Sequence, residues 1–573
     1  MTKRLILALL LSCSPLWATT YYVDNCVTVG SDRNNGTTTS TPWLTINKVN
    51  TSKFNPGDSI LFESTCTWRE QLTVPSSGSA RSPITFGAYG TGALPIFDGS
   101  AVVSTWTAAG VSYPNVWSAT VAATPNAVFN NNVFATQAAS EAALTEGQWF
   151  ANGTTLYYYE SAGNPSSQGY TIAAPARKWG INSNSQSYLT IQNIQIQKGN
   201  SSGIQVGISS NILINGVKSY YNAQGGIYIT GPVGGPTQTG FTVTNSDLAY
   251  NGQTGFSGAT YLSNLEISYN KIHNNCQLPV MSGALYMYDT SVQNVTIEYN
   301  EVYSNGLIAV VASNGTGIWS DTLGSGVVIR YNQVYGNVGN GIYTENNNGT
   351  EIYGNLVYSN ASQAGNAGIT VTADASGLAS SNNLVYSNTV YGNGLGIRLW
   401  GCVGSCAVPG TMIGNQVENN ISVGNTGAQL AVTGAATNTG GYGSGNVYLY
   451  NDFGPQGTNF IEWLYGVHYS TYAAWESAAG NCGTPGCSHS VQADPQFASA
   501  AASQFWLGSG SPAIDAGLNL GSPYNIALMP GSTWPNSVVT GDQNAYGSGW
   551  EIGAFIYVPP VAPATSLQVV KVN

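Results

Sequence analysis

Two acidic side chains stand at matching points of two similar segments, GIWSD at 317–321 and GIYTE at 341–345. Asp321 and Glu345 each follow the starting glycine by four residues, in a chain where only 7% of residues are charged. If the segments are neighbouring strands, their carboxyl groups lie roughly 5 to 6 Å apart, given a strand spacing of ~4.8 Å. Such a pair is unfavourable unless one acid is protonated or a cation is bound, so it suggests a functional site.

Aromatic residues accompany the two acids. Trp319 and Tyr343 lie two residues earlier on the same predicted face, and Arg398 with Trp400 continue the columns two repeats further on. The pattern describes an acidic patch walled by aromatic rings, which could supply stacking faces for sugars. The alternative is a pair of solvated acids at the ends of two strands. Asp289 is a further candidate. It lies two repeats from Glu345, so this pair would have a longer separation between its carboxyl groups, wide enough to admit a water molecule.

A repeat of about 23 to 34 residues positions these side chains. Taking each glycine as position zero, positions one and three are mostly apolar and are expected to point inward, while positions two and four point outward because strand side chains alternate. By this alignment Ala284 and Tyr286 point inward, and Leu285 and Met287 outward. The repeat units are SGIQV at 202, GGIYI at 225, SGALY at 282, TGIWS at 316, NGIYT at 340, AGITV at 367, LGIRL at 395 and TGAQL at 426.

Period-2 alternation inside such a repeat is typical of a solenoid, and the 3.6-residue period of helical repeats is absent. We therefore predict an all-β fold, a single-stranded right-handed parallel β-helix with an N-terminal cap, a small β-rich insertion and a C-terminal cap. The expected divisions are residues 1–18 (signal peptide), 19–100 (N-terminal cap and first rungs), 101–185 (insertion), 186–450 (β-helix), 451–557 (C-terminal cap region) and 558–573 (flexible tail).

Asparagine and tyrosine columns support the same repeat. Asn270, Asn300, Asn332, Asn355, Asn388 and Asn415 begin a recurring step, and a second asparagine column ends it at Asn275, Asn305, Asn337, Asn360, Asn393 and Asn420. Stacked asparagines can bond from rung to rung and tolerate turn conformations. His273 replaces tyrosine in the column of Tyr303, Tyr335, Tyr358 and Tyr391, which favours a structural role. Glu298 and Arg330 occupy equivalent positions on consecutive rungs and can form a lateral ion pair.

Composition limits the partners. A net charge of −11 with only 15 Lys and Arg argues against nucleic acid. The 14 Trp and 35 Tyr fit a neutral oligosaccharide or polysaccharide better, and we expect a monomer. No stretch after the first residues is apolar enough for a membrane span.

The amino terminus resembles a bacterial export signal cleaved near Ala18, which places the protein in the periplasm, at the cell surface or outside the cell. Cys13 lies in a sequence loosely similar to a lipoprotein box. Export permits disulfides, so we expect the pairs Cys402/Cys406, Cys482/Cys487 and Cys26/Cys66, with Cys276 left over.

The order of segments from Tyr21 to Ser100 resembles secreted pectate-lyase-like right-handed β-helix proteins. Within it, residues 43–50 are expected to form a short helix that caps the open end of the core. The pair GIWSD and GIYTE is similar to the paired acids of the β-helix β-xylosidases, and this resemblance covers residues 280 to 400. It implies a retaining glycoside hydrolase in which Asp321 is the nucleophile and Glu345 the acid/base. Trp319, Tyr343, Arg398, Trp400 and Asp289 are then the expected substrate-binding residues.

Two other functions remain open from the sequence. A polysaccharide lyase acting on a uronate polymer could hold calcium between Asp289, Asp321 and Glu345, with Lys271, Arg330 or Arg398 as base. A surface solenoid that binds sugar without catalysis is the third possibility. Unless the protein is a lyase, we expect neither a metal nor a cofactor. We also expect the Glu345 side chain to be exposed on the surface.

Overall fold

The computed structural model describes residues 18–110, 113–307, 314–362, 365–373, 378–401, 411–433, 445–457, 460–463, 466–477 and 487–559. The expected export signal with Cys13, the Cys402/Cys406 pair, Cys482 and the tail beyond residue 559 lie outside the described residues. No helix in the described ranges is long and apolar enough to cross a membrane.

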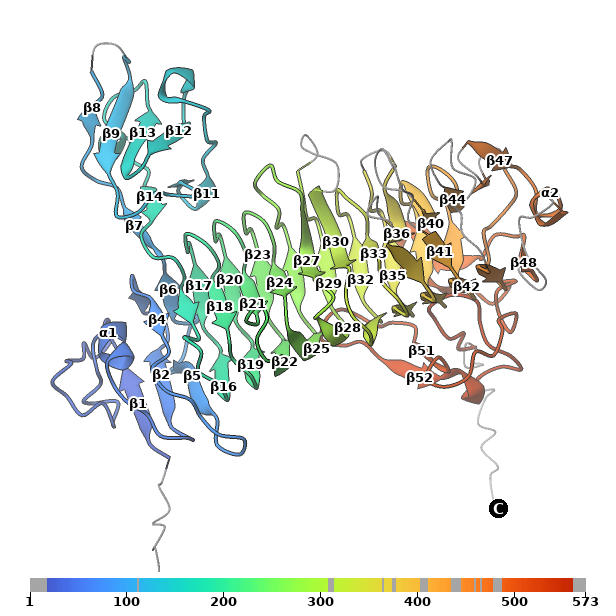
Figure 1. Cartoon of the computed structure of the whole chain (residues 1–573), viewed down its shortest axis with the longest axis horizontal. Helices are drawn as coiled ribbons and strands as arrows, with labels where there is room; N and C mark the ends of the chain where they lie inside the picture. Colours follow the sequence, from blue (N-terminus) through green and yellow to red (C-terminus); the bar gives the residue numbers. More distant parts are fainter. Residues whose placement is uncertain are drawn as a thin grey trace, which may run out of the picture.

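Three parallel sheets surround one elongated apolar core, and most turns of the chain add a strand to each sheet (Figure 1). Sheet A contains β1 (Thr20–Val23), β2 (Ser59–Glu63), β5 (Ile84–Tyr89), β16 (Leu189–Gln192), β19 (Ile212–Asn215), β22 (Gln238–Thr244), β25 (Leu262–Ser268), β28 (Gln293–Glu298), β31 (Val327–Arg330), β34 (Glu351–Tyr353), β38 (Leu384–Tyr386), β42 (Gln416–Glu418), β45 (Val447–Leu449) and β48 (Cys487–Ser488).

Sheet B contains β3 (Thr67–Trp68), β6 (Ile96–Asp98), β17 (Gln195–Gln197), β20 (Lys218–Tyr220), β23 (Asp247–Ala249), β26 (Lys271–His273), β29 (Glu301–Tyr303), β32 (Gln333–Tyr335), β35 (Leu356–Tyr358), β39 (Thr389–Tyr391) and β43 (Ile421–Val423). Sheet C, which carries the acids, contains β4 (Leu72–Thr73), β15 (Ile181–Asn182), β18 (Ile204–Gly207), β21 (Ile227–Thr230), β24 (Phe256–Ala259), β27 (Ser282–Tyr288), β30 (Asn314–Asp321), β33 (Ile342–Glu345), β36 (Ala367–Thr372), β40 (Leu395–Trp400), β44 (Leu430–Thr433), β46 (Ile461–Trp463) and β47 (Val467–Tyr469). All neighbours in these sheets pair in parallel except β46 and β47. The structure is a parallel β-helix, as predicted.

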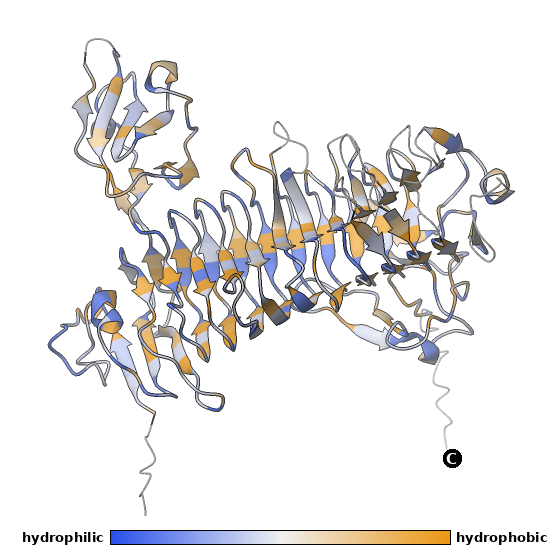
Figure 2. Ribbon diagram, viewed as in Figure 1, coloured by the Kyte–Doolittle hydropathy of each residue, from blue (hydrophilic) through white to orange (hydrophobic). Residues whose placement is uncertain are grey.

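Inward columns of apolar side chains hold the rungs together. Ile318, Ile342, Ile369 and Ile397 pair in register on successive strands of sheet C, and each is fully buried. Figure 2 shows apolar bands that recur from strand to strand. Burying one such side chain contributes about 1.5–3 kcal/mol, so the stacked columns stabilise the long core.

The rung that contains β27 has its predicted faces reversed. Leu285 and Met287 point inward and are fully buried, whereas Tyr286 points outward, the reverse of the sequence alignment. The cause is a bulge between Ser282 and Gly283, which shifts the pairing of β27 with β30 by one residue. The predicted outward direction of Leu285 and Met287 is therefore wrong, as is the inward direction of Tyr286.

Two buried asparagine ladders run along the solenoid, as predicted. In the first, each side-chain amide nitrogen donates to the amide oxygen of the next asparagine at 3.0 Å, through Asn270, Asn300, Asn332, Asn355, Asn388, Asn420 and Asn451. The second ladder continues from Asn393 to Asn425 at 3.2 Å. Asn420 thus belongs to the first ladder, and Asn415 belongs to a third with Asn383 and Asn446. The predicted places of Asn415 and Asn420 are wrong.

Helix α1, the cysteines near the amino-terminal end and His273 agree with the predictions made for them. Helix α1 (Ile46–Asn50) has Thr45 as its N-cap, and Cys26 and Cys66 form a disulfide. Cys276 is free and buried. His273 stacks on Tyr303 with ring centroids 4.7 Å apart.

The inserted segment forms small antiparallel sheets that project from the amino-terminal part of the solenoid (Figure 1). One sheet contains β8 (Thr107–Ala108), β9 (Val116–Thr120), β12 (Trp149–Asn152) and β13 (Thr155–Tyr159), and the other β7 (Ser100–Val102), β10 (Phe129–Asn130), β11 (Val133–Phe134) and β14 (Ile172–Pro175). Short 3-10 turns lie at Glu141–Ala143 and Pro165–Ser167.

The chain beyond β48 returns along the outside of the solenoid (Figure 1). It contains β49 (Phe497–Ser499), β50 (Gln504–Leu507), β51 (Ile526–Leu528), β52 (Thr540–Asp542) and 3-10 turns at Ala500–Ala502 and Gln543–Ala545. Helix α2 (Tyr472–Ser477) precedes β48. Tyr331 donates its hydroxyl proton to the carbonyl of Ile526 at 2.9 Å, and Trp534 donates to the carbonyl of Tyr331 at 2.7 Å. This segment covers one side of the solenoid, whereas Tyr472 and Trp475 of α2 pack into the end of its apolar core.

Asp452 makes the stability of this end depend on pH. Its carboxyl is fully buried, one oxygen accepts from the Gly454 amide at 2.8 Å, and the other has no hydrogen-bond partner among the described residues. Burial, aided by Asp494, raises the pKa of Asp452 to about 7. In the unfolded chain the pKa of an aspartate is about 3.9. The contribution of Asp452 to the free energy of unfolding is therefore fully present below about pH 4 and is lost as the pH rises towards 7.

Replacing Asp452 with Asn is therefore expected to stabilise the protein at about pH 8, by up to ~4 kcal/mol, and to change little at about pH 4. Urea unfolding at the two pH values tests this. Glu266→Gln is the control, because it neutralises an exposed acid on β25 that takes no part in raising the pKa of Asp452. An equal effect of Asp452→Asn at both pH values would contradict the assignment.

Candidate functional site

Asp321 and Glu345 are brought together by the register of sheet C. Asp321 is the last residue of β30, Glu345 is the last residue of β33, and the two are direct partners on adjacent parallel strands. The strand spacing of ~4.8 Å therefore places their carboxyl groups within several ångströms of each other on the outer face. The sequence predicted this juxtaposition.

Neighbouring donors orient both carboxyl groups. Tyr286 donates its hydroxyl proton to Oδ2 of Asp321 at 3.0 Å, and the Thr322 hydroxyl donates to Oδ1 at 2.8 Å. The indole N–H of Trp319 donates to Oε2 of Glu345 at 3.2 Å. Each acid thus has at least one oxygen held by a fixed donor.

The aromatic residues form a packed row beside the acids. Tyr286 and Trp319 have ring centroids 4.8 Å apart, and Trp319 meets Tyr343 edge to face at 5.3 Å. Trp319 and Tyr343 are 5% exposed and Glu345 is 9% exposed. The expectation that Glu345 is a surface group is therefore wrong. Burial, followed by the nearby Glu345, raises the pKa of Tyr343 well above its usual value, so this phenol stays neutral.

A buried polar cluster locks the ends of the two strands. Ser320 donates to the hydroxyl of Thr344 at 3.0 Å, and the amide of Asn347 donates to both hydroxyls at 3.0 and 2.8 Å. The amide oxygen of Asn347 accepts from the backbone of Leu323 at 2.7 Å. All three polar side chains are fully buried, so they fix the backbone from which the acids project.

Asp289 lies one residue beyond the column that contains the acids. Tyr288, not Asp289, pairs with Asp321. Asp289 adopts φ of 99° in the turn that follows, and its carboxyl accepts from the amide of Ser291 at 2.9 Å. Its backbone N–H donates to the carbonyl of Asp321 at 3.2 Å. The structure therefore gives Asp289 a turn-capping role at the edge of the site.

Arg398 and Trp400 end the patch two strands beyond Glu345, where the sequence placed them. The guanidinium carbon of Arg398 lies 3.8 Å from the centroid of the Trp400 ring. Arg398 also donates to the carbonyl of Gly365 at 2.6 Å. The cation thus stacks on the indole and bonds the backbone at one end of the row.

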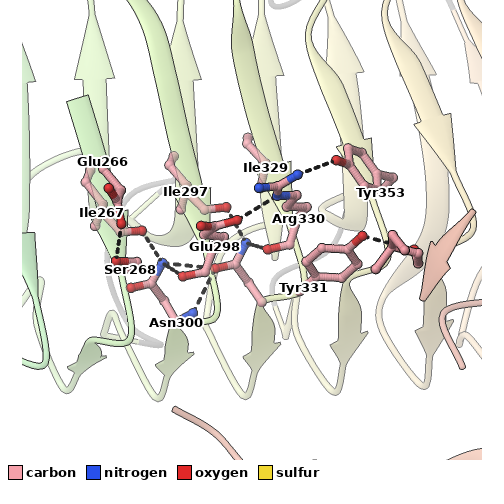
Figure 3. A network of polar contacts seen from close by, with 12 residues as sticks. Glu266, Ile267, Ser268, Ile297, Glu298, Asn300, Ile329, Arg330, Tyr331 and Tyr353 are labelled. Carbon is pink, nitrogen blue, oxygen red and sulfur yellow. Dashed lines mark hydrogen bonds and ion pairs between the residues drawn. The ribbon is translucent and has the colours of Figure 1, made fainter. Parts of the chain in front are cut away.

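The other two candidate bases lie on different sheets. Lys271 belongs to sheet B and forms an ion pair of 3.6 Å with Glu301. Arg330 belongs to sheet A, where its Nε lies 2.6 Å from Glu298 and its Nη1 donates to the hydroxyl of Tyr353 at 2.8 Å (Figure 3). The predicted lateral ion pair is confirmed. Neither cation is placed to take a proton beside the two acids of sheet C.

The three acids considered as calcium ligands do not gather into one cluster. Among the described residues, Asp24, Cys26 and Cys66 form the one group of three potential metal ligands whose ligand atoms all lie within 4.8 Å of one another. These cysteines form a disulfide and offer no free thiolate.

Tyr286 is the site residue that the sequence alignment missed. Reading Leu285 and Met287 as the apolar inward pair would have placed Tyr286 on the outer face, next to Trp319. The signal was present, because leucine and methionine fit a packed column better than tyrosine does.

The chain matches the family model described as "Right handed beta helix region" over residues 179–357. The solenoid is therefore a right-handed parallel β-helix, and this part of the prediction is confirmed. Over 76 residues the chain is 41% identical to a lacto-N-biosidase of Bifidobacterium longum subsp. longum, a match that covers 13% of this chain and 5% of that relative.

Solved structures with a similar fold include both hydrolases and lyases. XylC in complex with xylose aligns with a TM-score of 0.47 and 15% identity, over 71% of this chain and 69% of that chain. Pectate lyase Pel9A aligns with a TM-score of 0.45 and 16% identity, over 94% of this chain and 96% of that chain.

Proposed function

We propose that this protein is a carbohydrate-active enzyme, a retaining glycoside hydrolase with Asp321 as nucleophile and Glu345 as general acid and base. The observation that carries the proposal is the in-register pairing of the two acids on adjacent strands. Retaining glycosidases hold their carboxyl groups about 5–5.5 Å apart, and inverting enzymes about 6.5–9.5 Å apart to admit a water. A strand spacing of ~4.8 Å supports the shorter separation.

The reaction proceeds in two steps at these residues. An oxygen of Asp321 attacks the anomeric carbon while the bond to the leaving oxygen breaks, and Glu345 gives its proton to that oxygen. A water then enters, Glu345 takes one of its protons, and the resulting hydroxyl attacks the anomeric carbon and releases Asp321. Two inversions at the same carbon leave its configuration unchanged.

The hydrogen bonds around the acids support these roles. Tyr286 and Thr322 both donate to Asp321, which orients its oxygens as acceptors on the strand end. Trp319 donates to one oxygen of Glu345, which holds the side chain in place. Preorganised groups of this kind lower the cost of reaching the reactive geometry.

The local relative also supports a carbohydrate-active enzyme, since the segment that is 41% identical belongs to a lacto-N-biosidase, a glycoside hydrolase. The proposal places the enzyme outside the cytoplasm, as the predicted export signal implies. A lyase is less well supported, because Lys271 and Arg330 form ion pairs on other sheets and the Arg398 guanidinium stacks on Trp400 and donates to the Gly365 carbonyl.

The purified protein should be assayed on neutral and uronic-acid glycans, with and without a chelator. We expect new reducing ends without an unsaturated product that absorbs in the ultraviolet, and no loss of activity with the chelator. Proton NMR of the first product should show the anomeric configuration of the substrate.

Three outcomes would contradict the proposal. An unsaturated product formed only with calcium would indicate a lyase, and an inverted first product would exclude direct attack by Asp321. Binding without any product would indicate a sugar-binding solenoid.

A further inference from the structure

A pocket of about 280 Å³ opens on the outer face of sheet C, on the side of Asp321 away from Glu345. Its walls include Tyr228 of β21, Ser257 of β24, and Tyr286 and Tyr288 of β27. Residues of the turns that precede β18, β21 and β24 complete the lining. The volume is near the lower end of the ~300–1,000 Å³ of small-molecule sites, so it suits one small unit of a larger ligand.

The pocket exists because one side chain in the aromatic row is small. Tyr228, Ser257 and Tyr286 are direct partners on three successive strands, and Trp319 and Tyr343 follow them. With strands ~4.8 Å apart, the backbones that carry the two tyrosines are about 9.6 Å apart, and a serine lies between them. Beyond the gap, Tyr286, Trp319 and Tyr343 pack ring against ring, so the aromatic row is filled from Tyr286 onwards.

The pocket is connected directly to the proposed nucleophile. Tyr286 lines it and also donates to Oδ2 of Asp321 at 3.0 Å. Tyr288 stacks on Tyr286 with ring centroids 5.4 Å apart, and it is the strand partner of Asp321. A ligand unit in the pocket would therefore lie next to a sugar held over Asp321.

The lining also indicates the chemistry of the occupant. The nine lining residues are tyrosine, serine, threonine, glutamine and glycine, and none carries a charge. Hydroxyls, amides and tyrosine rings suit a neutral sugar, which presents both hydroxyl groups and an apolar face. A uronate would bring a carboxylate into this pocket without a partner cation, which is unfavourable.

We propose that this pocket is a binding subsite for a neutral sugar unit on the glycone side of the cleaved bond, so the substrate carries at least two sugars on that side. This rests on the proposed function, because Glu345 must face the departing oxygen and the pocket lies beyond Asp321 in the opposite direction. The substrate class is then a neutral oligosaccharide or polysaccharide, not a uronate polymer.

Filling the gap tests the subsite. Ser257→Tyr continues the row of aromatic side chains on an outward position of a strand, and Tyr228→Ala removes one wall. Thr190→Tyr is the matched control, because Thr190 points outward from β16 in sheet A. Thermal unfolding of each variant establishes that the fold is kept.

The first measurement is kinetic. Aryl glycosides with the same leaving group on one neutral sugar or on two should differ, with kcat/KM higher for the disaccharide by at least about tenfold in the wild type, equivalent to ~1.4 kcal/mol. Ser257→Tyr and Tyr228→Ala should remove this advantage and spare the monosaccharide glycoside, whereas Thr190→Tyr should keep it. An unchanged advantage in both pocket variants would overturn the subsite, as would an effect seen only when sugars are added on the leaving-group side.

The second measurement does not require catalysis. Asp321→Asn protein should bind short neutral oligosaccharides in calorimetry, and adding Ser257→Tyr should weaken binding by at least about tenfold. If no variant hydrolyses any glycan but this loss is seen, the proposed reaction is wrong. The pocket then stands as a neutral-sugar site, and only its assignment to the glycone side falls with the reaction. Preferential binding of galacturonate oligomers, or binding that survives both pocket substitutions, would overturn the subsite.

Discussion

Replacing Asp321 with Asn is expected to lower kcat on a cleaved glycoside by at least about 10⁴-fold, while the melting temperature stays close to that of the wild type. Tyr286 and Thr322 donate to different oxygens of Asp321, so the amide oxygen of asparagine can accept one of these bonds. The amide nitrogen takes the other position, where the hydroxyl can turn to accept from it, so the strand end keeps its contacts. A neutral amide cannot form the glycosyl ester, so the first step fails. Steady-state kinetics and thermal unfolding measure the two quantities.

Glu266→Gln is the matched control for this loss. Glu266 is an exposed acid on sheet A that accepts from Ser268 at 2.8 Å (Figure 3), so its neutralisation changes charge without touching sheet C. Its kcat should stay within about twofold of the wild type. If Asp321→Asn retained more than about a hundredth of wild-type turnover, a nucleophilic role for Asp321 would be excluded.

Much of the solenoid could be predicted from the sequence because its repeat obeys local rules. Ile318, Ile342, Ile369 and Ile397 follow glycines at one spacing, and alternation along a strand decides which face each occupies. The same spacing pairs Asp321 with Glu345. Position in the repeat was therefore sufficient to find the two acids.

Irregular rungs could not be predicted by the same rule. The bulge at Ser282 and Gly283 shifts Tyr286 to the outer face, and glycine spacing carries no sign of it. The strand from Phe256 was absent from the aligned repeats, so Ser257 and the pocket beside it were missed. At the far end Leu430, not Ala428, pairs with Ile397, a shift of two residues that preserves the inward face.

Burial on the outer face depends on contacts between rungs. Trp319 and Tyr343 point away from the core but bury each other, and Trp319 bonds Glu345. Contacts of distant segments were equally hidden, such as that of Tyr331 with Ile526. Alternation predicts the direction of a side chain, but it does not predict what covers it.

Glu345→Ala is expected to reduce turnover of natural glycosides by about 10²–10⁴-fold, and to spare the first step on a substrate with a good leaving group. Such a leaving group departs without a proton, so Asp321 can still form the ester. The second step then stalls, because no base remains to take a proton from water. Azide needs no deprotonation and fits the space vacated by the carboxyl group, so it should restore turnover of the activated substrate in a concentration-dependent manner.

The product of this rescue identifies the roles of the two acids. Azide enters from the face opposite Asp321, so the glycosyl azide should have the anomeric configuration of the substrate, which proton NMR can determine. Asp321→Asn is the control, because without the nucleophile azide can attack only the substrate itself and would give the inverted azide. A retained azide from Glu345→Ala requires a covalent intermediate on Asp321. An inverted azide from Glu345→Ala would contradict the roles of Asp321 as nucleophile and Glu345 as acid and base. Equal rescue of both variants by azide would contradict them too.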